Sequence, residues 1–281
     1  MARGRHLEAI RAEGLIVRRP RGKQRVPVLA SDSATELGTV DLVLFAVKLW
    51  DTETAAQQMA PMLGAQATVL VLQNGVDALD LLAPILGRDR LLGGVAQISA
   101  VIVAPGIVAH RSHFARIIAG KPGGGYSERV TGLVDVLSRA GIGIEAQASL
   151  EIAVDLWAKF AFIVGLSGAT SLFRAMIGPI RENEQTTAFP RNLVAEAVAV
   201  GRAEGVALPG DQVERTMAFI QGLPSGMTAS MCEDLLAGYR LELPWLSGRV
   251  VRSGAAHGIP TPANATVELG LLLHTAGRSA D

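Results

Sequence analysis

Short apolar runs alternate with amphipathic stretches through the first half of the chain. The runs at residues 42–47, 67–72 and 91–98 are almost continuously apolar, as in strands buried within a parallel sheet. The pattern predicts helices at 3–14, 52–63, 78–86 and 127–140. It predicts strands at 26–29, 42–47, 67–72, 91–98 and 142–146, and further strands within 99–120 that are joined by a Pro105-Gly106 turn. Strands and helices in this order indicate a parallel sheet with helices on its faces.

The second half of the chain has a different pattern. After residue 148 the strand-like runs stop, and the apolar positions follow the period of a helix. The expected helices cover residues 153–173, 190–204, 212–219, 230–237, 245–257 and 265–274. We therefore predict an α/β domain over residues 1–147 and an all-helical domain over residues 148–281. Many two-domain dehydrogenases have this layout, although a fold alone does not determine a function.

Composition narrows the expected partners and compartment. Lys and Arg together number 26, as do Asp and Glu, so the formal net charge is zero and neither nucleic-acid nor electrostatic membrane binding is expected. The charged N-terminal stretch lacks the apolar core of a secretory signal, and the apolar stretch at 160–173 is too short for a membrane span. Cys232 is the only cysteine, which excludes an internal disulfide. We expect a soluble, cytoplasmic protein with Cys232 as an unreactive core residue.

Polar side chains follow two of the expected strands at the point where each strand ends. Lys48 comes directly after the run 42–47, and Gln73-Asn74-Gly75 follows the run 67–72. Ligands of open parallel sheets bind outside the carboxyl ends of the strands, where a lysine and an amide can hold a phosphate, carboxylate or ribose. Two structural readings stay open: Lys48 as a surface lysine, and Asn74 as a left-handed turn residue before Gly75.

The helical half offers further polar candidates. Lys159 lies within the apolar segment DLWAKFAF, where burial lowers the pKa of a lysine and suits it to donate a proton near neutral pH. A lysine on a solvated stripe is the alternative. The block 230–248 adds Ser230, Glu233, Asp234 and Glu242 in an apolar background. The scattered histidines and the lone cysteine do not indicate a metal site.

These segments carry a resemblance. AVKLWDT, QNGV, GGVAQISAVIVAPGIVAH, LWAKF and SMCEDLLAGYRLELPWLSGRVVRSGAAHGIPTP, in this order and spacing, resemble the ketopantoate reductases (2-dehydropantoate 2-reductases). The resemblance runs over nearly the whole chain. It implies a Rossmann-like domain followed by a helical substrate and dimerisation domain, and an NADPH-dependent reduction of a small 2-keto acid in pantothenate biosynthesis. A homodimer is one assembly that such a helical domain would allow, and the sequence does not fix the oligomeric state.

The resemblance assigns roles to individual positions. Lys48 and Asn74 match residues where cofactor and substrate meet, and Lys159 matches the lysine proposed as the general acid. Ser230 matches a ligand of the substrate carboxylate. Glu242 matches a carboxylate that binds the substrate or orients the lysine.

The chain departs from the family pattern around the substrate. Ile163 and Ser167 stand where the family has asparagines after the lysine, and Met227 stands where an asparagine often precedes the serine. Amides that would bind a hydroxylated keto acid are therefore replaced. A site without them is expected to prefer a less polar keto acid than ketopantoate.

A second departure concerns the cofactor. The family begins with a strand, a G-x-G-x-x-G turn and a helix, and no G-x-G-x-x-G occurs in this sequence. Arg3 matches the residue that faces the 2′-phosphate of NADP. We therefore expect a Rossmann-like sheet that lacks its first strand–helix unit, from a mis-assigned start or a truncated gene, with an unpaired edge on strand 42–47. A non-catalytic remnant of this fold and a related hydroxy-acid dehydrogenase remain alternative functions.

Overall fold

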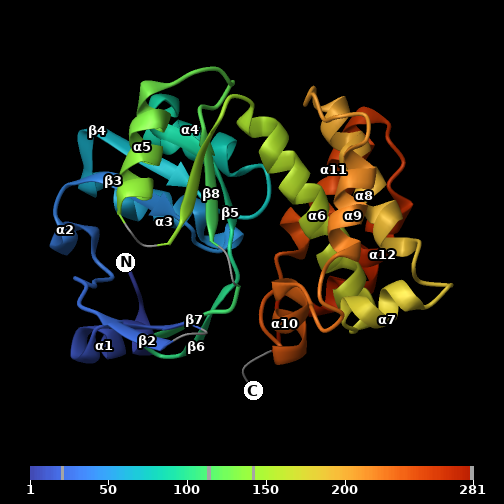
Figure 1. Ribbon diagram of the computed structural model, residues 1–281, viewed down its shortest axis with the longest axis horizontal. Helices are drawn as coiled ribbons and strands as arrows, with labels where there is room; N and C mark the ends of the chain where they lie inside the picture. The colour runs from blue at the N-terminus through green and yellow to red at the C-terminus, as the bar shows by residue number, and fades with distance from the viewer. Residues whose placement is uncertain (20–21, 113–114, 141–142, 279–281) are drawn as a thin grey trace. The chain divides into compact units, whose positions relative to one another are not determined.

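The alternating runs of the first half form a five-stranded sheet in the computed structural model, which describes residues 1–19, 22–112, 115–140 and 143–278 (Figure 1). Its strands, in spatial order, are β3 (Val40–Phe45), β4 (Leu63–Val71), β5 (Leu91–Gln97), β8 (Arg116–Gly120) and β9 (Glu145–Ser149). The strands β3, β4 and β5 are parallel, whereas β8 pairs with β5 in the antiparallel direction. The predicted parallel arrangement therefore holds for the strands that carry the candidate residues.

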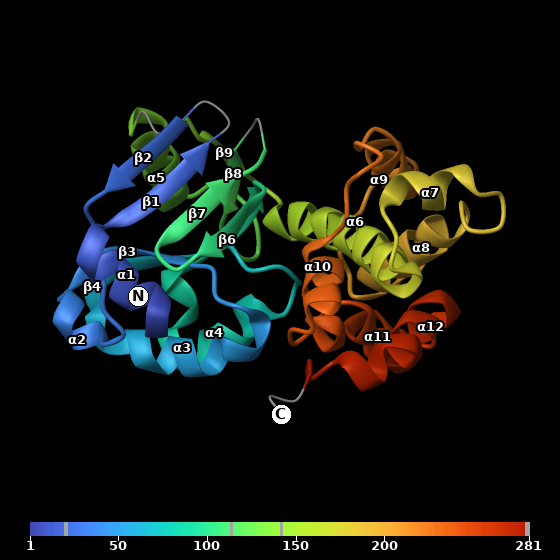
Figure 2. The ribbon, with the colours of Figure 1, turned by 90° about the horizontal axis from the view of Figure 1, so that it is seen from below.

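Helices cover both faces of this sheet. They are α3 (Thr52–Met59), α4 (Ala78–Leu86) and α5 (Glu128–Arg139). Apolar side chains of α3 and α4 share one core cluster with β3, β4 and β5, and those of α5 share another with β4, β5 and β8. Figure 2 shows α3 and α4 on one side of the sheet and α5 on the other. The first unit thus has the layered α/β arrangement that the alternating pattern predicts.

The predicted buried strand at 42–47 lies at the edge of the sheet. Among the described residues β3 pairs with β4 alone, so the expected unpaired edge is present. The expectation of burial on both faces is wrong, because Leu44 is 50% exposed while Phe45 is only 3% exposed. An edge strand has a neighbour on one side only and is less fully covered than a central one.

A second, four-stranded sheet completes the first unit. Its strands, in spatial order, are β2 (Gly22–Val26), β1 (Leu15–Arg19), β7 (Ile107–His110) and β6 (Ala100–Ala104). Helix α1 (Gly4–Glu13) packs on it through Leu7 and Ile10. The strands β6 and β7 are joined at the predicted Pro105-Gly106 turn, where Gly106 has φ +72° and a side chain would meet Ala9 of α1. Only a glycine fits this close approach without strain.

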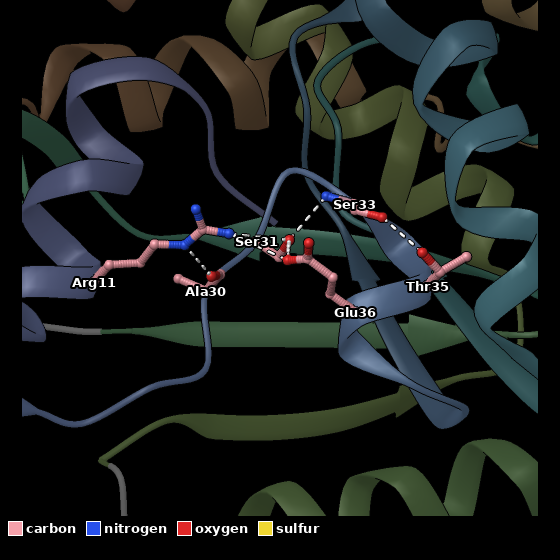
Figure 3. A network of polar contacts seen from close by, with 6 residues as sticks. All are labelled: Arg11, Ala30, Ser31, Ser33, Thr35 and Glu36. Carbon is pink, nitrogen blue, oxygen red and sulfur yellow. Dashed lines mark hydrogen bonds and ion pairs between the residues drawn. The ribbon is translucent and has the colours of Figure 1, made fainter.

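The strand predicted at 26–29 is not formed, and β2 ends at Val26. Pro27 has no N–H to donate to a strand ladder, so the chain leaves the sheet there. A polar network fastens the following segment to α1 and to α2 (Ala34–Leu37) (Figure 3). Arg11 donates to the Ala30 carbonyl oxygen at 3.1 Å and lies 3.2 Å from Glu36. The strand predicted at 142–146 is β9, three residues further on, and residues 141–142 lie outside the described part of the chain.

The second unit is built from helices, as predicted. They are α6 (Ile152–Phe173), α7 (Ile177–Glu182), α8 (Phe189–Ala203), α9 (Gln212–Gln221), α10 (Ser230–Ala237), α11 (Ser247–His257) and α12 (Pro262–Leu271), with a 3₁₀ helix at Leu243–Trp245. Helix α7 was not predicted, because its six residues are too few to show a period. Two short segments, Lys48–Trp50 and Asn74–Asp77, also belong to this unit. The two segments that follow β3 and β4 are therefore part of the helical unit.

Helix α6 forms the centre of the helical core. Among the described helices, it alone is long and apolar enough to cross a membrane, by length and composition only. Of its most apolar stretch of 18 residues, 56% is buried inside the protein. Its residues Trp157, Phe160 and Val164 pack within the largest buried cluster. Cys232 of α10 is buried beside it, with its sulfur 3.3 Å from the Thr170 carbonyl oxygen. The apolar stretch at 160–173 is therefore part of a core helix, as the sequence predicts.

Candidate active site

The two segments that carry Lys48 and Asn74 leave the sheet at the same edge. Because β3 and β4 are parallel neighbours, their carboxyl ends lie together. The side-chain amide of Gln73 donates to the Val47 carbonyl oxygen and to the Thr52 hydroxyl, each at 2.9 Å. Gln73 thus fixes the backbone directly before Lys48 and directly before Asn74. The two polar segments that follow these strands therefore lie at the same end of the sheet.

Lys48 lies against two carboxylates of the helical unit. Its Nζ is 2.8 Å from Oδ2 of Asp234 and 3.8 Å from Oε2 of Glu242. The Lys48 side chain is 43% exposed, and the Glu242 side chain is only 7% exposed. Lys48 therefore presents one side of its ammonium to solvent and neutralises buried negative charge with the other. This arrangement differs from that of an unpaired surface lysine.

Glu242 is a buried carboxylate held from two directions. Its Oε1 accepts a hydrogen bond from the Leu49 backbone N–H at 3.3 Å, and its Oε2 faces Lys48. A buried carboxylate stays ionised only where hydrogen bonds and positive charge compensate its desolvation. Lys48 and the Leu49 amide supply that compensation. Glu242 can therefore act as a fixed negative charge within the helical unit.

The charge of Glu242 also affects the pKa of Lys159. Burial lowers the pKa of Lys159 from 10.5 to about 8, and the negative charge of Glu242 opposes that shift. Lys159 lies on α6 among apolar neighbours, which is the environment that the sequence predicts. A lysine with a pKa of about 8 is protonated at neutral pH and gives up its proton more readily than a solvated lysine. Such a side chain is chemically able to donate a proton near neutral pH.

Asn74 and Ser230 are the remaining candidates in this unit. Asn74 is half-buried and precedes Gly75, which has φ +85°. Asn74 itself has no positive φ, so its alternative reading as a left-handed turn residue is wrong. A side chain at Gly75 would lie 3.5 Å from Leu49, which places the Asn74 segment against the Lys48 segment. Ser230 is the exposed first residue of α10, one turn before the Asp234 that pairs with Lys48.

At the three positions where the family has asparagines, this chain has Ile163, Ser167 and Met227. Ile163 and Ser167 follow Lys159 at intervals of four residues, so the three share one face of α6. Ile163 and Met227 pack against the helical core, and Ser167 is buried. No amide stands at any of these positions.

Several site residues were not predicted. The rings of Trp50 and Trp245 lie 6.3 Å apart, and the guanidinium of Arg240 lies 4.8 Å from the Trp50 ring centroid. Asp234 appears in the polar block of the sequence, but nothing there shows that it pairs with a residue 186 positions away. The four-residue spacing from Ser230 to Asp234, which places both on one face of α10, is the available signal.

Residues suited to the two ends of a nicotinamide dinucleotide are present. Arg3, in the first unit, is exposed and donates to the Gln58 side-chain oxygen at 3.0 Å, which leaves other guanidinium N–H groups for an anion. Lys48 and Asn74, at the strand ends, suit the reacting end. A glycine turn for the pyrophosphate is not among the described residues. By its own chemistry, each of these groups suits one end of such a cofactor.

The chain thus combines an α/β sheet unit with a helical unit that holds a half-buried lysine and a buried carboxylate. This is the layout of a two-domain dehydrogenase. Residues 1–123 match the family model described as ketopantoate reductase PanE/ApbA, and residues 151–269 match the model of its C-terminal part. The chain belongs to the ketopantoate reductase family.

Individual relatives agree with this assignment. The 2-dehydropantoate 2-reductases of Mesorhizobium japonicum and Caulobacter vibrioides are each 32% identical to the chain, over 93% and 91% of its length and 85% and 84% of theirs. The crystal structure of a PanE/ApbA family ketopantoate reductase from Ralstonia eutropha JMP134 has a TM-score of 0.88 at 31% identity, covering 98% of this chain and 89% of that one. The chain thus shares both sequence and fold with this family over most of its length.

Proposed function

We propose that the protein reduces a small 2-keto acid to the 2-hydroxy acid with NADPH, as in the reaction of pantothenate biosynthesis. The observation that carries this proposal is the half-buried Lys159 among apolar residues of α6, whose pKa burial lowers to about 8 while the charge of the buried Glu242 opposes that shift. The cofactor, when bound, supplies a hydride to the keto carbon. The protein must then deliver one proton to the keto oxygen, and Lys159 is suited to do so.

The other candidates bind and orient the substrate. Ser230 and Asn74 donate hydrogen bonds to the substrate carboxylate and the keto oxygen. Glu242 keeps Lys159 protonated before the transfer by its negative charge. Lys48 offsets the charge of Glu242 and, together with Asn74, holds the nicotinamide end of the cofactor. Each role follows from the donor and acceptor capacity of the side chain.

Substrate preference tests this function. Because no amide stands at Ile163, Ser167 or Met227, the hydroxyl of ketopantoate lacks a strong partner. We expect kcat/KM for ketopantoate to be no higher than for 2-ketoisovalerate, which has no hydroxyl. A preference for ketopantoate above about 10³-fold would mean that other groups hold the hydroxyl. In the matched variant Ile163→Asn, the preference is expected to shift towards ketopantoate. Absence of reduction with any small 2-keto acid would contradict the proposed function itself.

Arg3 is expected to select NADPH over NADH. A guanidinium binds a phosphate through two parallel charge-assisted hydrogen bonds, which an alanine cannot replace. Arg3→Ala should raise KM for NADPH by about 10-fold and leave KM for NADH nearly unchanged, a loss of the size of one such contact. Steady-state kinetics with both cofactors measure this, with the nearby exposed Arg5→Ala as the control. Equal effects on the two cofactors would remove Arg3 from phosphate recognition.

The pH dependence of the two reaction directions follows from Lys159. Reduction needs the protonated lysine, so its rate should fall as the pH rises through about 8, the pKa of Lys159. Oxidation of the hydroxy acid needs the neutral lysine to accept a proton, so its rate should rise through the same pH. Measuring kcat in both directions from about pH 6 to about pH 10 tests this. If the rates of reduction and oxidation both rise, or both fall, through this pH, the titrating group is not Lys159.

We further propose that the protein works in the cytoplasm as a homodimer. The neutral balance of charge and the single buried cysteine support the compartment.

A further inference from the structure

Arg249 joins the Asn74 segment to helix α11. Its Nε lies 2.5 Å from Oδ1 of Asp77, the last residue of the segment Asn74–Asp77. Its two terminal nitrogens lie 2.7 and 2.9 Å from the two oxygens of Glu204, at the end of α8. One guanidinium therefore binds two carboxylates at the same time, a geometry that a lysine cannot reproduce.

Further contacts fix Arg249 in place. Glu204 also accepts a hydrogen bond from the Ser253 hydroxyl at 2.6 Å. The guanidinium carbon of Arg249 lies 5.9 Å from the ring centroid of Trp157, which precedes Lys159 by two residues on α6. Arg249, on α11, thus has partners on α6, at the end of α8 and on the Asn74 segment. All of these residues belong to the helical unit.

This network differs from the ion pairs on the surface of the same unit. The side chains of Arg249, Asp77 and Glu204 are 16%, 27% and 21% exposed, whereas those of the pair Arg191–Glu214 are 50% and 57% exposed. Exposed pairs contribute little because solvent screens them, while largely buried and bidentate pairs hold their partners in a defined geometry. The network therefore restricts where Asp77 lies.

The Asn74 segment is anchored just before its start by the hydrogen bonds of Gln73 and at its end by the Arg249 network. Val76 packs against the helical core, and Gly75 approaches Leu49 and the Trp245 carbonyl oxygen. Asn74 is three residues from Asp77 in the same short segment, so we expect a displacement of Asp77 to shift its amide. A misplacement of about 1 Å at a group that orients the substrate can lower the rate by about 10²-fold.

We propose that Arg249 and Asp77 are positioning residues that hold Asn74 in its working place in the reductase site. The proposal rests on the proposed function, since it gives Asn74 a role in orienting the substrate. Neither residue touches the reacting atoms. They act through Asn74, and Glu204 acts through Arg249.

A double-mutant cycle separates positioning from general stability. Asp77→Ala should lower kcat by about 10-fold with KM for NADPH unchanged, and in the Asn74→Ala background the same change should lower kcat by less than about 2-fold, since coupled residues are not additive. Asp77→Asn keeps an acceptor for Arg249 and should cost less than Asp77→Ala. Glu214→Ala, which breaks the exposed pair, should have little effect in either background. Equal losses from Asp77→Ala with and without Asn74 would overturn the proposal.

Hydrogen exchange provides a readout that does not depend on activity. In the full chain, Asp77→Ala and Arg249→Lys should each speed amide exchange in peptides covering residues 74–77 by about 5-fold or more, and Glu214→Ala should leave those peptides unchanged. Unchanged exchange in Asp77→Ala and Arg249→Lys would overturn the proposal even if activity falls. If the protein reduces no keto acid, the proposed function fails, while faster exchange still shows that Arg249 orders this segment. If Asn74→Ala is fully active, the catalytic part of the proposal is overturned.

Discussion

Replacing Lys159 with alanine is expected to lower kcat for keto-acid reduction by about 10²-fold or more, the usual contribution of a general acid. Without the ammonium group, the oxygen of the forming hydroxy acid must take its proton from water. Binding of NADPH should change little, because the candidate cofactor contacts lie at other residues. Single-turnover measurements at saturating substrate isolate this effect from substrate binding.

Two comparisons make the Lys159 result specific. Lys121→Ala, at an exposed turn of the first unit, should retain full activity. Loss of the pH limb near 8 in Lys159→Ala should accompany the loss of rate, because the limb belongs to the lysine. A variant with near-normal turnover and an unchanged pH profile would make Lys159 a structural residue.

Glu242→Gln is expected to have the second large effect. The amide keeps the size of the side chain and an acceptor for the Leu49 N–H, but it removes the negative charge beside Lys48 and Lys159. We expect kcat/KM to fall by about 10²-fold, within the range for groups that support proton transfer. The pH limb of reduction should also move below about 8, since the charge of Glu242 raises the pKa of Lys159.

The position of the pH limb identifies the role of Glu242. A glutamate that only binds the substrate would change KM and leave the limb in place. Glu182→Gln, at the exposed end of α7, is the matched control and should change neither quantity. A limb that stays at the same pH in Glu242→Gln would remove the electrostatic link between Glu242 and Lys159.

The helical half was the more predictable part of the fold. Helix α10 has the bounds read from the sequence, and α6 and α8 differ from the prediction by one residue at their ends. Helix α6 is a long run of almost continuously apolar residues, and α8 is long enough to show an amphipathic period. The short strands β1 and β2 were missed, since β2 (GKQRV) is polar and mostly exposed and carries no apolar run. Its pairing with β1 is a tertiary effect that local pattern does not record.

The sequence offers candidate site residues one at a time but not the contacts between them. Lys48 and Asn74 were accessible from strand ends, and Lys159 from its apolar surroundings. The ion pair from Lys48 to Asp234, and that from Arg249 to Asp77, join residues more than 170 positions apart. No local period or motif encodes such a pairing in one sequence. Only the structure shows these pairings, because it places the segments after β3 and β4 in the helical unit.

Because the Cys232 thiol is buried, its reaction with a thiol reagent measures how often the helical unit opens. The side chain is fully buried, and burial raises the pKa of its thiol, so a thiol-specific reagent has neither access nor a reactive thiolate while α10 stays packed. Because Cys232 is the only cysteine, every labelling event marks an opening of this helix. The labelling rate of the unmodified chain, compared with and without keto acid, thus measures how strongly substrate holds α10 closed.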